Sequence, residues 1–254
     1  MEPAAFFEGL DVVGASRELV ALGGTLEPDT LRAAYRAGCF PWPATGSHER
    51  VLARQVRRLA GRRQVPVLPG TDGLVPWCSP HPRAVLLTDQ LHVPRSLRQR
   101  LRRSGWTTTV DVAFDRVLAG CADRDETWIT GRMREAYSAL HARGHAHSVE
   151  VWDGDDLVGG LYGVLTGRVF SGESMFHLVG GASKVAVVDL CHRLCEAGVR
   201  VLDTQQESEH LAVLGQVLVS REEYVSAVHA LRDLPAVLPT ERRDVALLSP
   251  PATR

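Results

Sequence analysis

Two segments in the C-terminal half of the chain carry polar side chains that could act on a substrate together. Glu173 lies in RVFSGESMF, and Asp203 and Gln205 lie in VRVLDTQ. Alternate side chains of a strand share a face, so we expect Glu173 to lie on the same face as Met175. For the same reason Asp203 and Gln205 should share a face with Val201. If the two strands are neighbours, two carboxylates and an amide converge. Because an unpartnered carboxylate is costly to bury, these carboxylates either have a polar partner or line a cleft. For Asp203 the partner would be a salt bridge or a capping contact at the end of the strand.

A glycine-rich turn, HLVGGASK, precedes a predicted helix and supplies a second candidate site. The first-turn N–H groups of that helix would face whatever lies over Gly180 and Gly181, which is the geometry of an anion site. Lys184 is the only lysine of the chain and falls in this first turn. A cation there opposes the helix dipole and indicates a nearby acid or phosphate. A two-glycine turn with a solvated lysine is the plainer alternative.

Other chemistries find little support in the sequence. His145 and His147 form a HAH pair, but no cysteine or acidic residue is spaced to complete a metal site. No serine occupies a nucleophile elbow and no GxxxxGK loop occurs, which argues against hydrolases and nucleoside triphosphatases. Trp42, Trp77 and Trp128 flank turns or helix starts, where they either stack on a base or pack against the core.

Helices and strands alternate after residue 84, and their order predicts how the polar segments meet. The strands HSVEVWD, LVGGLYGVL and RVFSGESMF follow one another with short turns and form an antiparallel meander. The amphipathic helix ASKVAVVDLCHRLCEAG then leads to VRVLDTQ. Because such crossovers are right-handed and return to the same sheet, RVFSGESMF and VRVLDTQ should be parallel and adjacent. Earlier in this region we expect helices at VPRSLRQRLRRSG, FDRVLAGCADR and TWITGRMREAYSALHARG, and a strand at WTTTVDV.

The N-terminal part is predicted to consist of short helices and turns. TLEPDTLRAAYRAG indicates a helix with an N-cap at Thr25 or Asp29 and an end at Gly38. Residues 44–76 have the character of an insertion that begins with a basic helix and ends in an exposed loop, VPVLPGTDGLVP. The following WCSPHPR is extended by its prolines and marks a domain boundary.

The formal net charge of −1 hides an asymmetry along the chain. Residues 1–149 carry 20 Lys and Arg against 15 Asp and Glu, whereas residues 150–254 carry 9 against 15. The basic excess is concentrated in HERVLARQVRRLAGRR and RSLRQRLRR. This favours a polyanionic partner on the N-terminal side, with solvated helix faces as the alternative.

Composition narrows the class of protein. With 44% hydrophobic and 23% charged residues the chain can bury a core, and five cysteines without framework spacing indicate reduced thiols in the cytoplasm. No apolar run approaches the roughly 18 residues of a membrane helix, so export and membrane insertion are not expected.

Several of these motifs together resemble the leucyl/phenylalanyl-tRNA:protein transferase family. The resemblance rests on AYRAGCFPW, WCSPHPR, TWITGRMREAYSALHARGHAHSVEVWDGDDLVGGLYGV, FSGESMF, ASK and LDTQ. It implies an α+β fold with a small N-terminal domain, residues 1–81, that includes the insertion. A GCN5-like N-acyltransferase (GNAT-like) domain with a central mixed, mostly antiparallel sheet would follow at residues 82–234. Residues 235–254 would form a loosely ordered tail.

The function that the resemblance implies is aminoacyl transfer. Leucine or phenylalanine, and less readily methionine, would move from leucyl-tRNA or phenylalanyl-tRNA to the N-terminal arginine or lysine of an acceptor protein. The product would be marked for degradation by the N-end rule. No cofactor or metal is implied, and we expect a monomeric cytoplasmic enzyme. Asp203, through Gln205, would orient and help deprotonate the acceptor amine while Glu173 holds its cationic side chain, or the two carboxylates would exchange these roles.

The resemblance also indicates which residues hold the donor. By motif match, Trp42 and Trp128 contact the aminoacyl-adenosine end, and Leu161 and Met175 line the pocket for the amino-acid side chain. Ser174 and Phe170 are further candidates for substrate binding. Contacts with the rest of the tRNA are expected from Lys184, Arg98, Arg102, Arg57 and Arg58.

The sequence departs from the family pattern in three places, which keeps two other functions open. Cys78 stands where a second tryptophan is usual, Val213 and Gln216 stand where serine and alanine are usual, and residues 44–76 contain the insertion. One alternative is a CoA-dependent GNAT acetyltransferase, supported by the strand order and by the likeness of HLVGGA to a pyrophosphate loop. The other is a catalytically silent tRNA-binding protein or degradation adaptor.

Overall fold

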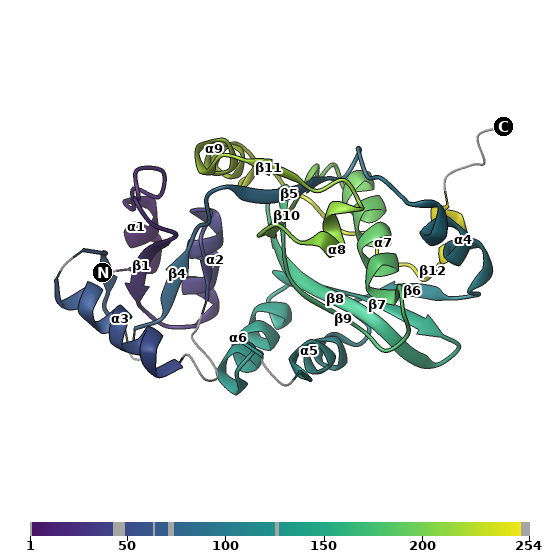
Figure 1. Cartoon of the computed structure of the whole chain (residues 1–254), viewed down its shortest axis with the longest axis horizontal. Helices are drawn as coiled ribbons and strands as arrows, with labels where there is room; N and C mark the ends of the chain where they lie inside the picture. The colour runs from purple at the N-terminus through teal and green to yellow at the C-terminus, as the bar shows by residue number, and fades with distance from the viewer. Residues whose placement is uncertain (1, 43–48, 63, 71–73, 125–126, 250–254) are drawn as a thin grey trace.

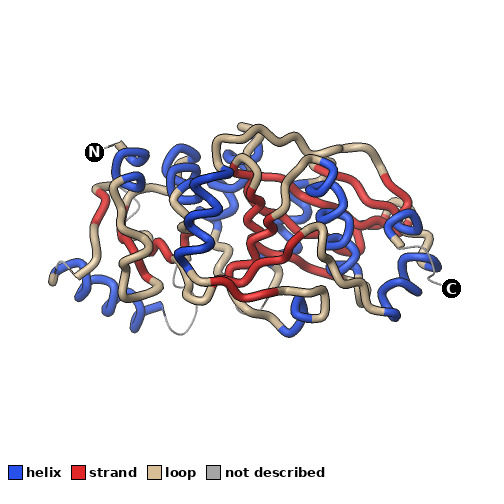
Figure 2. The backbone as a smooth tube through the Cα atoms, turned by 90° about the horizontal axis from the view of Figure 1, so that it is seen from above, coloured by secondary structure: helices blue, strands red, loops and turns tan. Residues whose placement is uncertain are grey.

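Two β-sheets organise the chain and lie one after the other along an elongated molecule (Figures 1 and 2). The computed structural model describes residues 2–42, 49–62, 64–70, 74–124 and 127–249. The N-terminus lies at one end of the molecule and the C-terminus at the other (Figure 1).

The smaller sheet is built from the N-terminal segment. Its elements are α1 (Pro3–Glu8), β1 (Leu19–Gly23), α2 (Pro28–Arg36), β2 (Phe40–Pro41), α3 (Glu49–Gly61), β3 (Val67–Leu68) and β4 (Pro76–Cys78), with the strand order β2-β4-β1-β3. The predicted helix around TLEPDTLRAAYRAG is α2. Its N-cap is Glu27 rather than Thr25 or Asp29, because Pro28 has the fixed φ that suits the first helical position.

The expectation of an exposed loop at the end of the insertion is wrong in part. β3 pairs in parallel with β1, and β4 pairs antiparallel with it. The basic run forms α3, whose Val56 and Leu59 are buried together with Leu22 of β1. Arg57 and Arg58 remain exposed on the same helix. The apolar stripe of an otherwise basic helix therefore fixes the insertion against the sheet.

The second sheet begins after a link from Ser79 to Pro82, where the predicted domain boundary falls. Its elements are β5 (Arg83–Leu87), α4 (Arg95–Arg103), β6 (Thr107–Val110), α5 (Phe114–Ala122), α6 (Gly131–Ala142), β7 (Ala146–Asp153), β8 (Asp156–Thr166), β9 (Val169–His177), α7 (Ala182–Glu196), β10 (Val201–Gln205), α8 (Glu209–Ala212), β11 (Val217–Val219), α9 (Arg221–Leu231), β12 (Arg243–Asp244) and the 3-10 helix η2 (Val245–Leu248).

The larger sheet has the strand order β11-β5-β10-β9-β8-β7-β6-β12. Among its described strands, β9 and β10 are the parallel neighbours, and the other pairs are antiparallel. The meander β7-β8-β9 and the crossover through α7 are confirmed. The fold is a mixed α+β arrangement whose sheet is mostly antiparallel, as the sequence predicts.

Helices cover both faces of the larger sheet (Figure 1). Buried residues of α5 and α6 belong to one apolar cluster, and those of α4 and α7 belong to another. The cluster under α5 and α6 continues into the N-terminal elements, and the hydroxyls of Tyr35 and Tyr137 lie 2.7 Å apart across the junction. No helix in the described ranges is long and apolar enough to cross a membrane.

The C-terminal segment was expected to be a loosely ordered tail, but it forms β12 and η2. β12 extends the sheet beside β6, and η2 packs against α4 and α7. The fully buried Arg193 of α7 donates to the carbonyl oxygens of Pro239 and Glu241 at 2.6 and 2.9 Å. Because a buried guanidinium needs acceptors, it holds this segment in place. The expectation is wrong for residues 235–249, and residues 250–254 lie outside the described ranges.

Candidate active site

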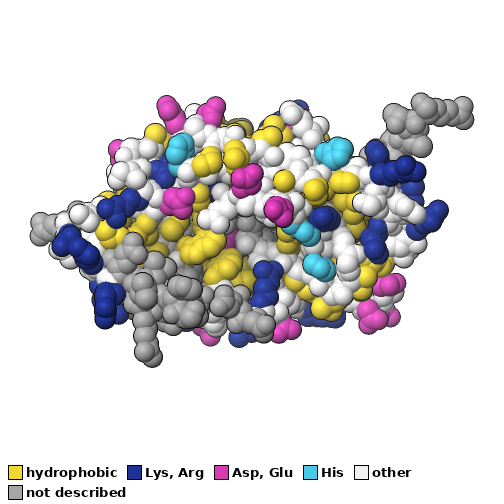
Figure 3. All heavy atoms as spheres, viewed as in Figure 1, with side chains coloured by type: hydrophobic (Ala, Val, Ile, Leu, Met, Phe, Trp, Pro, Cys, Tyr) yellow, Lys and Arg dark blue, Asp and Glu magenta, His cyan; other side chains and the backbone are white. Residues whose placement is uncertain are grey.

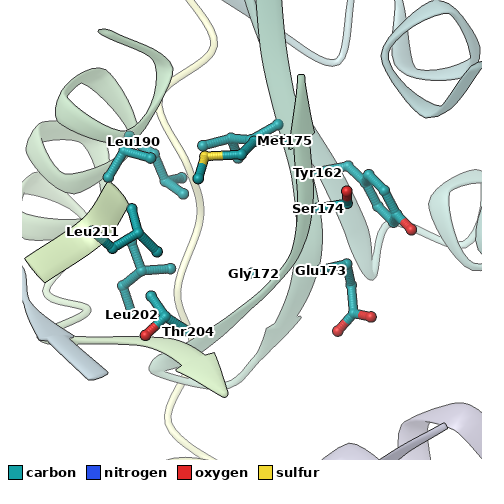
Figure 4. A pocket seen from close by; sticks show the side chains of 11 residues that line it. Tyr162, Gly172, Glu173, Ser174, Met175, Leu190, Leu202, Thr204 and Leu211 are labelled. Carbon is teal, nitrogen blue, oxygen red and sulfur yellow. The ribbon is translucent and has the colours of Figure 1, made fainter. Parts of the chain in front are cut away.

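The parallel pairing of β9 and β10 ends early, and the two strands enclose a cavity beyond that point. Their register runs from Val169 and Val201 to Ser171 and Asp203. The cavity has a volume of about 110 Å³, and residues of α7 and α8 line it on one side. Figure 4 shows the apolar side chains that point into it. These are Leu161, Met175, Val187, Leu190, Leu202 and Leu211.

β9 bulges at Glu173, which changes the face on which this carboxylate lies. β9 has one extra residue opposite the step from Tyr162 to Gly163 of β8. A bulge of this kind reverses the alternation of side chains. Met175 packs on the α7 side, whereas Glu173 contacts Tyr137 of α6 on the other side (Figure 4). The expectation that Glu173 and Met175 share a face is therefore wrong.

Glu173 is buried in a network of hydroxyl and amide donors. Tyr137 donates its hydroxyl to Oε2 at 2.7 Å, and Gln205 donates Nε2–H to Oε1 at 2.9 Å. Burial raises the pKa of Glu173 to about 7, although hydrogen bonds from Tyr35 and Tyr137 act in the opposite direction. A carboxyl group with such a pKa can take up or release a proton near neutral pH.

Asp203 has both carboxylate oxygens engaged inside the protein. Arg83 donates from Nε to Oδ1 at 2.8 Å and from Nη2 to Oδ2 at 2.7 Å. Tyr224 and Ser171 donate their hydroxyls to Oδ2 at 2.8 and 3.2 Å. The side chains of Arg83 and Asp203 are 1% and 0% exposed. Asp203 thus pairs rather than lining a cleft.

Gln205 connects the buried ion pair to Glu173. Its backbone N–H donates to Oδ1 of Asp203 at 2.9 Å, and its φ is +65°, which is uncommon for a residue other than glycine. This conformation directs the side-chain amide to Glu173. As predicted, the two carboxylates and the amide converge. Val201, Asp203 and Gln205 all face the cluster that contains Tyr137 and Tyr224, although the register of β10 with β5 shifts between Asp203 and Gln205.

A second cavity of about 610 Å³ lies over Glu173 and Gln205. Trp42 and Trp128 line it together, with ring centroids 6.2 Å apart and ring planes 15° from parallel. Trp77, by contrast, is fully buried and donates Nε1–H to the carbonyl of Gly23 at 2.8 Å. Of the two alternatives for these tryptophans, Trp77 takes the core position, while Trp42 and Trp128 are brought to the cleft.

Of the remaining residues predicted to bind substrate, the structure places three at a cavity and one in the apolar core. Ser174 lines both cavities and accepts a hydrogen bond from Arg124 at 3.4 Å. Leu161 and Met175 face the smaller cavity. Phe170 is fully buried in the cluster under α7 and is not among the lining residues, because it lies where β9 is still paired with β10.

The predicted tRNA contacts do not form one surface. Arg57 and Arg58 are on α3, whereas Arg98 and Arg102 are on α4, and these helices lie at opposite ends of the molecule (Figures 1 and 2). Lys184 is half-buried in the first turn of α7. Figure 3 likewise shows basic side chains towards both ends of one face. Within the described ranges, no group of three His, Cys, Asp or Glu side chains is placed to hold a metal ion.

Sequence reasoning missed the partners that hold the polar cluster. Arg83 lies in WCSPHPR, which we interpreted as a boundary and as a family motif, and its guanidinium stacks on the rings of Phe40 and Tyr224 at 4.9 and 4.3 Å. An arginine at the start of the apolar run RAVLL was the available signal, because a buried cation needs a buried acid. Tyr35 and Tyr137 fell on apolar helix stripes, and only their neighbours in space give their hydroxyls a role.

Comparison with family models and curated proteins gives consistent matches. A family model described as leucyl/phenylalanyl-tRNA protein transferase matches residues 85–229, and one described as its N-terminal domain matches residues 24–52. The leucyl/phenylalanyl-tRNA–protein transferase of Hydrogenovibrio crunogenus is 44% identical over 82% of this chain and 73% of that protein. The protein with the same name from Pseudomonas syringae pv. tomato is 43% identical over 81% and 80% of the two chains.

Solved structures match less closely. The structure of L-PGS from Bacillus licheniformis aligns with a TM-score of 0.37 and 14% identity over 52% of this chain and 50% of that chain. A conserved protein of unknown function from Bacteroides thetaiotaomicron aligns with a TM-score of 0.42 and 10% identity over 94% and 93% of the two chains.

Proposed function

This chain belongs to the leucyl/phenylalanyl-tRNA protein transferase family, and on that premise we propose how its cleft joins an amino acid to an acceptor protein. The enzyme moves an aminoacyl group from aminoacyl-tRNA to the N-terminal residue of a protein. One observation supports this cleft as the site of the reaction: the buried Glu173 and the amide of Gln205 are hydrogen-bonded at the boundary between an apolar cavity and a larger cleft.

The larger sheet serves as a GCN5-like acyltransferase scaffold. Three features support this assignment: the antiparallel strands β7, β8 and β9, the crossover through α7, and the parallel strand β10. The cavity opens where β9 and β10 stop pairing. The acyl donor binds in that gap.

The amino-acid side chain of the donor enters the smaller cavity. Its apolar lining suits leucine and phenylalanine, which make no hydrogen bonds through their side chains. Such a pocket separates substrates that differ by a methylene by only about 1–3 kcal/mol, so methionine is transferred at a lower rate. Trp42 and Trp128 hold the adenosine end of the donor in the larger cleft.

The acceptor nitrogen loses two protons and forms one new bond. The α-ammonium group gives its first proton to Glu173, and the neutral amine attacks the ester carbonyl carbon. The bond between that carbon and the ribose oxygen then breaks, the second proton of the nitrogen ends on the ribose oxygen, and Glu173 releases the first proton to water. An α-amino group has a pKa of about 7.7–8.0, so a carboxylate with a pKa of about 7 is well matched to it.

The structure favours Glu173 as the proton acceptor, which is half of the exchanged assignment, but it does not favour Asp203 as the residue that holds the cationic side chain of the acceptor. Glu173 lines the cleft, whereas Asp203 is enclosed by Arg83 and Tyr224. Asp203 is therefore a positioning residue that fixes the backbone of Gln205. Gln205 holds Glu173 through Nε2 and offers its carbonyl oxygen to the acceptor ammonium.

The acceptor is an N-terminal arginine or lysine. Its cationic side chain is attracted by carboxylates of the same cleft. Besides Glu173, those lining it are Asp123 and Glu207. Positioning of the two substrates supplies most of the rate enhancement, because the aminoacyl ester is already activated.

The direct test is transfer of radiolabelled phenylalanine from its tRNA to a peptide that begins with arginine, with an acetyl-CoA reaction run in parallel. We expect label on the peptide from the tRNA and no acetylation. Acetylation without aminoacyl transfer would replace this proposal with CoA chemistry. Donor binding without any transfer would indicate a silent binder.

A further inference from the structure

Three side chains that carry, or can acquire, positive charge lie near one another beside the larger cleft. His177 at the end of β9 and His210 in α8 line the cleft, and Lys184 in the first turn of α7 is close enough to act on His210. The hydroxyl of Ser183 lies 3.3 Å from Nδ1 of His177 and 3.3 Å from Nε2 of His210. The two imidazole rings are stacked, with centroids 6.4 Å apart and planes 6° from parallel. Figure 3 shows histidine and basic side chains together near the centre of this face.

No carboxylate in the described part of the chain forms an ion pair with any of these three side chains. Burial, the Lys184 ammonium and the His177 ring, in that order, lower the pKa of His210. Glu207 lines the same cleft and Glu209 precedes His210 in α8, but neither offsets this effect. The structure thus places three basic side chains together without an ion-paired carboxylate among the described residues.

Two buried arginines elsewhere in the molecule, by contrast, have acidic partners. Arg83 pairs with Asp203, and Arg193 pairs with Asp189. A group of basic side chains without an acidic partner attracts an anion, because a bound anion favours their protonated forms. The cluster therefore points to a negatively charged ligand that comes from outside.

The residues that line the cleft identify the ligand. This inference rests on the proposed function. Glu173 and Gln205 line the same cavity as His177 and His210, so the reacting ester and the cluster share one site of about 610 Å³. Ligand sites of this kind commonly measure about 300–1,000 Å³. In the donor, the group of fixed negative charge nearest the ester is the phosphate of the same nucleotide.

We propose that His177, Lys184 and His210 bind the phosphate of the 3′-terminal nucleotide of the aminoacyl-tRNA. Lysine holds phosphate as a point charge, and each imidazolium can donate N–H to a phosphate oxygen. Contacts of this kind position a nucleic acid without reading its sequence. Together with the apolar cavity, the phosphate site anchors the donor on both sides of the reacting ester.

Phosphate binding is coupled to protonation of His210. A bound anion favours the imidazolium form, which burial, Lys184 and the neighbouring ring disfavour in His210. The groups facing His210 are Lys184 and Ser183 from α7 and His177 from β9, with Glu207 and Glu209 adjacent in its own segment. The preference for a phosphorylated donor should therefore increase from pH 8 to pH 6.

The test compares two synthetic donors, 3′-O-phenylalanyl adenosine and the same compound with a 5′-phosphate. We expect wild-type protein to show a kcat/KM about tenfold higher for the phosphorylated donor at pH 6.5. The ratio should fall towards one in Lys184→Met and His210→Asn, because these variants lose contacts with the phosphate. A purely structural defect would slow both donors equally and leave the ratio unchanged. His229→Asn, on the remote helix α9, is the matched control and should keep the wild-type ratio.

Calorimetric binding of adenosine 5′-monophosphate and adenosine separates this inference from the proposed function, because it requires no transfer. Tighter binding of the monophosphate by wild-type protein, lost in Lys184→Met and His210→Asn, supports the phosphate site even if transfer fails. Equal binding of both compounds, or a difference that survives both substitutions, overturns it.

Discussion

Glu173 combines two properties that suit a proton acceptor: it lines the cleft, and its pKa is raised to about 7 by burial. The neighbours that hold it are fixed in turn. Tyr137 donates to one oxygen and Gln205 to the other, and the Arg83–Asp203 pair fixes Gln205. The site is thus a chain of buried contacts that ends at one titratable group.

Transfer should depend on pH through Glu173. Its ionised form accepts the proton, so the rate should fall as the pH drops below about 7. Tyr137→Phe removes a hydrogen bond that lowers this pKa and should move the acid limb of the kcat profile to higher pH. Tyr162→Phe is the control, because the buried Tyr162 hydroxyl has no hydrogen-bond partner among the described residues. An acid limb that Tyr137→Phe leaves in place would contradict this role.

Asp203→Asn should destabilise the protein, because it leaves the buried Arg83 without its counter-charge. We expect the free energy of unfolding in denaturant to fall by about 3–5 kcal/mol. The exposed pair of Asp233 with Arg36 is the comparison, and Asp233→Asn should leave the free energy of unfolding close to that of the wild type.

The double variant Arg83→Met, Asp203→Leu separates positioning from stability. Replacing both charges by apolar side chains should restore most of the stability. Transfer should stay low, because the backbone N–H of Gln205 has lost its acceptor. Wild-type transfer by this variant would show that Asp203 does not position Gln205.

Residue patterns predicted part of this site. The alternation of VRVLDTQ placed Asp203 and Gln205 on one face, and the crossover rule placed that strand beside β9. The bulge at Glu173 was not predicted, because it depends on the pairing with β8, and no local pattern in RVFSGESMF marks an extra residue. The role of Arg83 depends on a contact between strands 120 positions apart in the sequence.

At the scale of elements, long periodic segments were predicted well and very short ones were not. The strands β7 to β10 and the helices α4 to α7 lie close to their predicted ranges. β3 and β12 have two residues each, too few to show a period. The order of the C-terminal segment depends on backbone carbonyls that accept from Arg193, and a sequence pattern does not reveal such acceptors.

Truncation tests the role of that segment. A chain that ends at residue 234 loses both carbonyl acceptors of Arg193 and the buried Leu238, Val245 and Leu248. Its free energy of unfolding should fall by about 3 kcal/mol or more. A chain that ends at residue 249 keeps these contacts and should melt like the wild type. Equal melting temperatures for both truncated chains would contradict the assignment.

At the scale of the whole molecule, the two basic helices lie too far apart in the fold to act as one patch (Figures 1 and 2). The sequence showed two arginine-rich runs but not their separation, which depends on how the two sheets follow each other. α4 contacts α7, the helix that carries Lys184, whereas α3 covers the smaller sheet. We therefore propose that the tRNA contact lies on α4.

Salt dependence distinguishes the two helices. Replacing Arg98 and Arg102 by Gln should reduce the slope of log K against log salt for donor binding by about one to two. The matched pair Arg57→Gln and Arg58→Gln on α3 should leave the slope unchanged. A reduced slope for the α3 pair alone would move the tRNA contact to the insertion.

The central claim is that Glu173 accepts the proton of the acceptor amine, and single-turnover transfer by Glu173→Gln tests it most directly. With both substrates saturating at pH 7, we expect the rate to fall about 100-fold or more, since positioned general bases contribute about 10²–10⁴-fold. Donor binding and the rate of the control Glu135→Gln, on α6, should be unchanged. A Glu173→Gln rate close to that of the wild type would contradict the account.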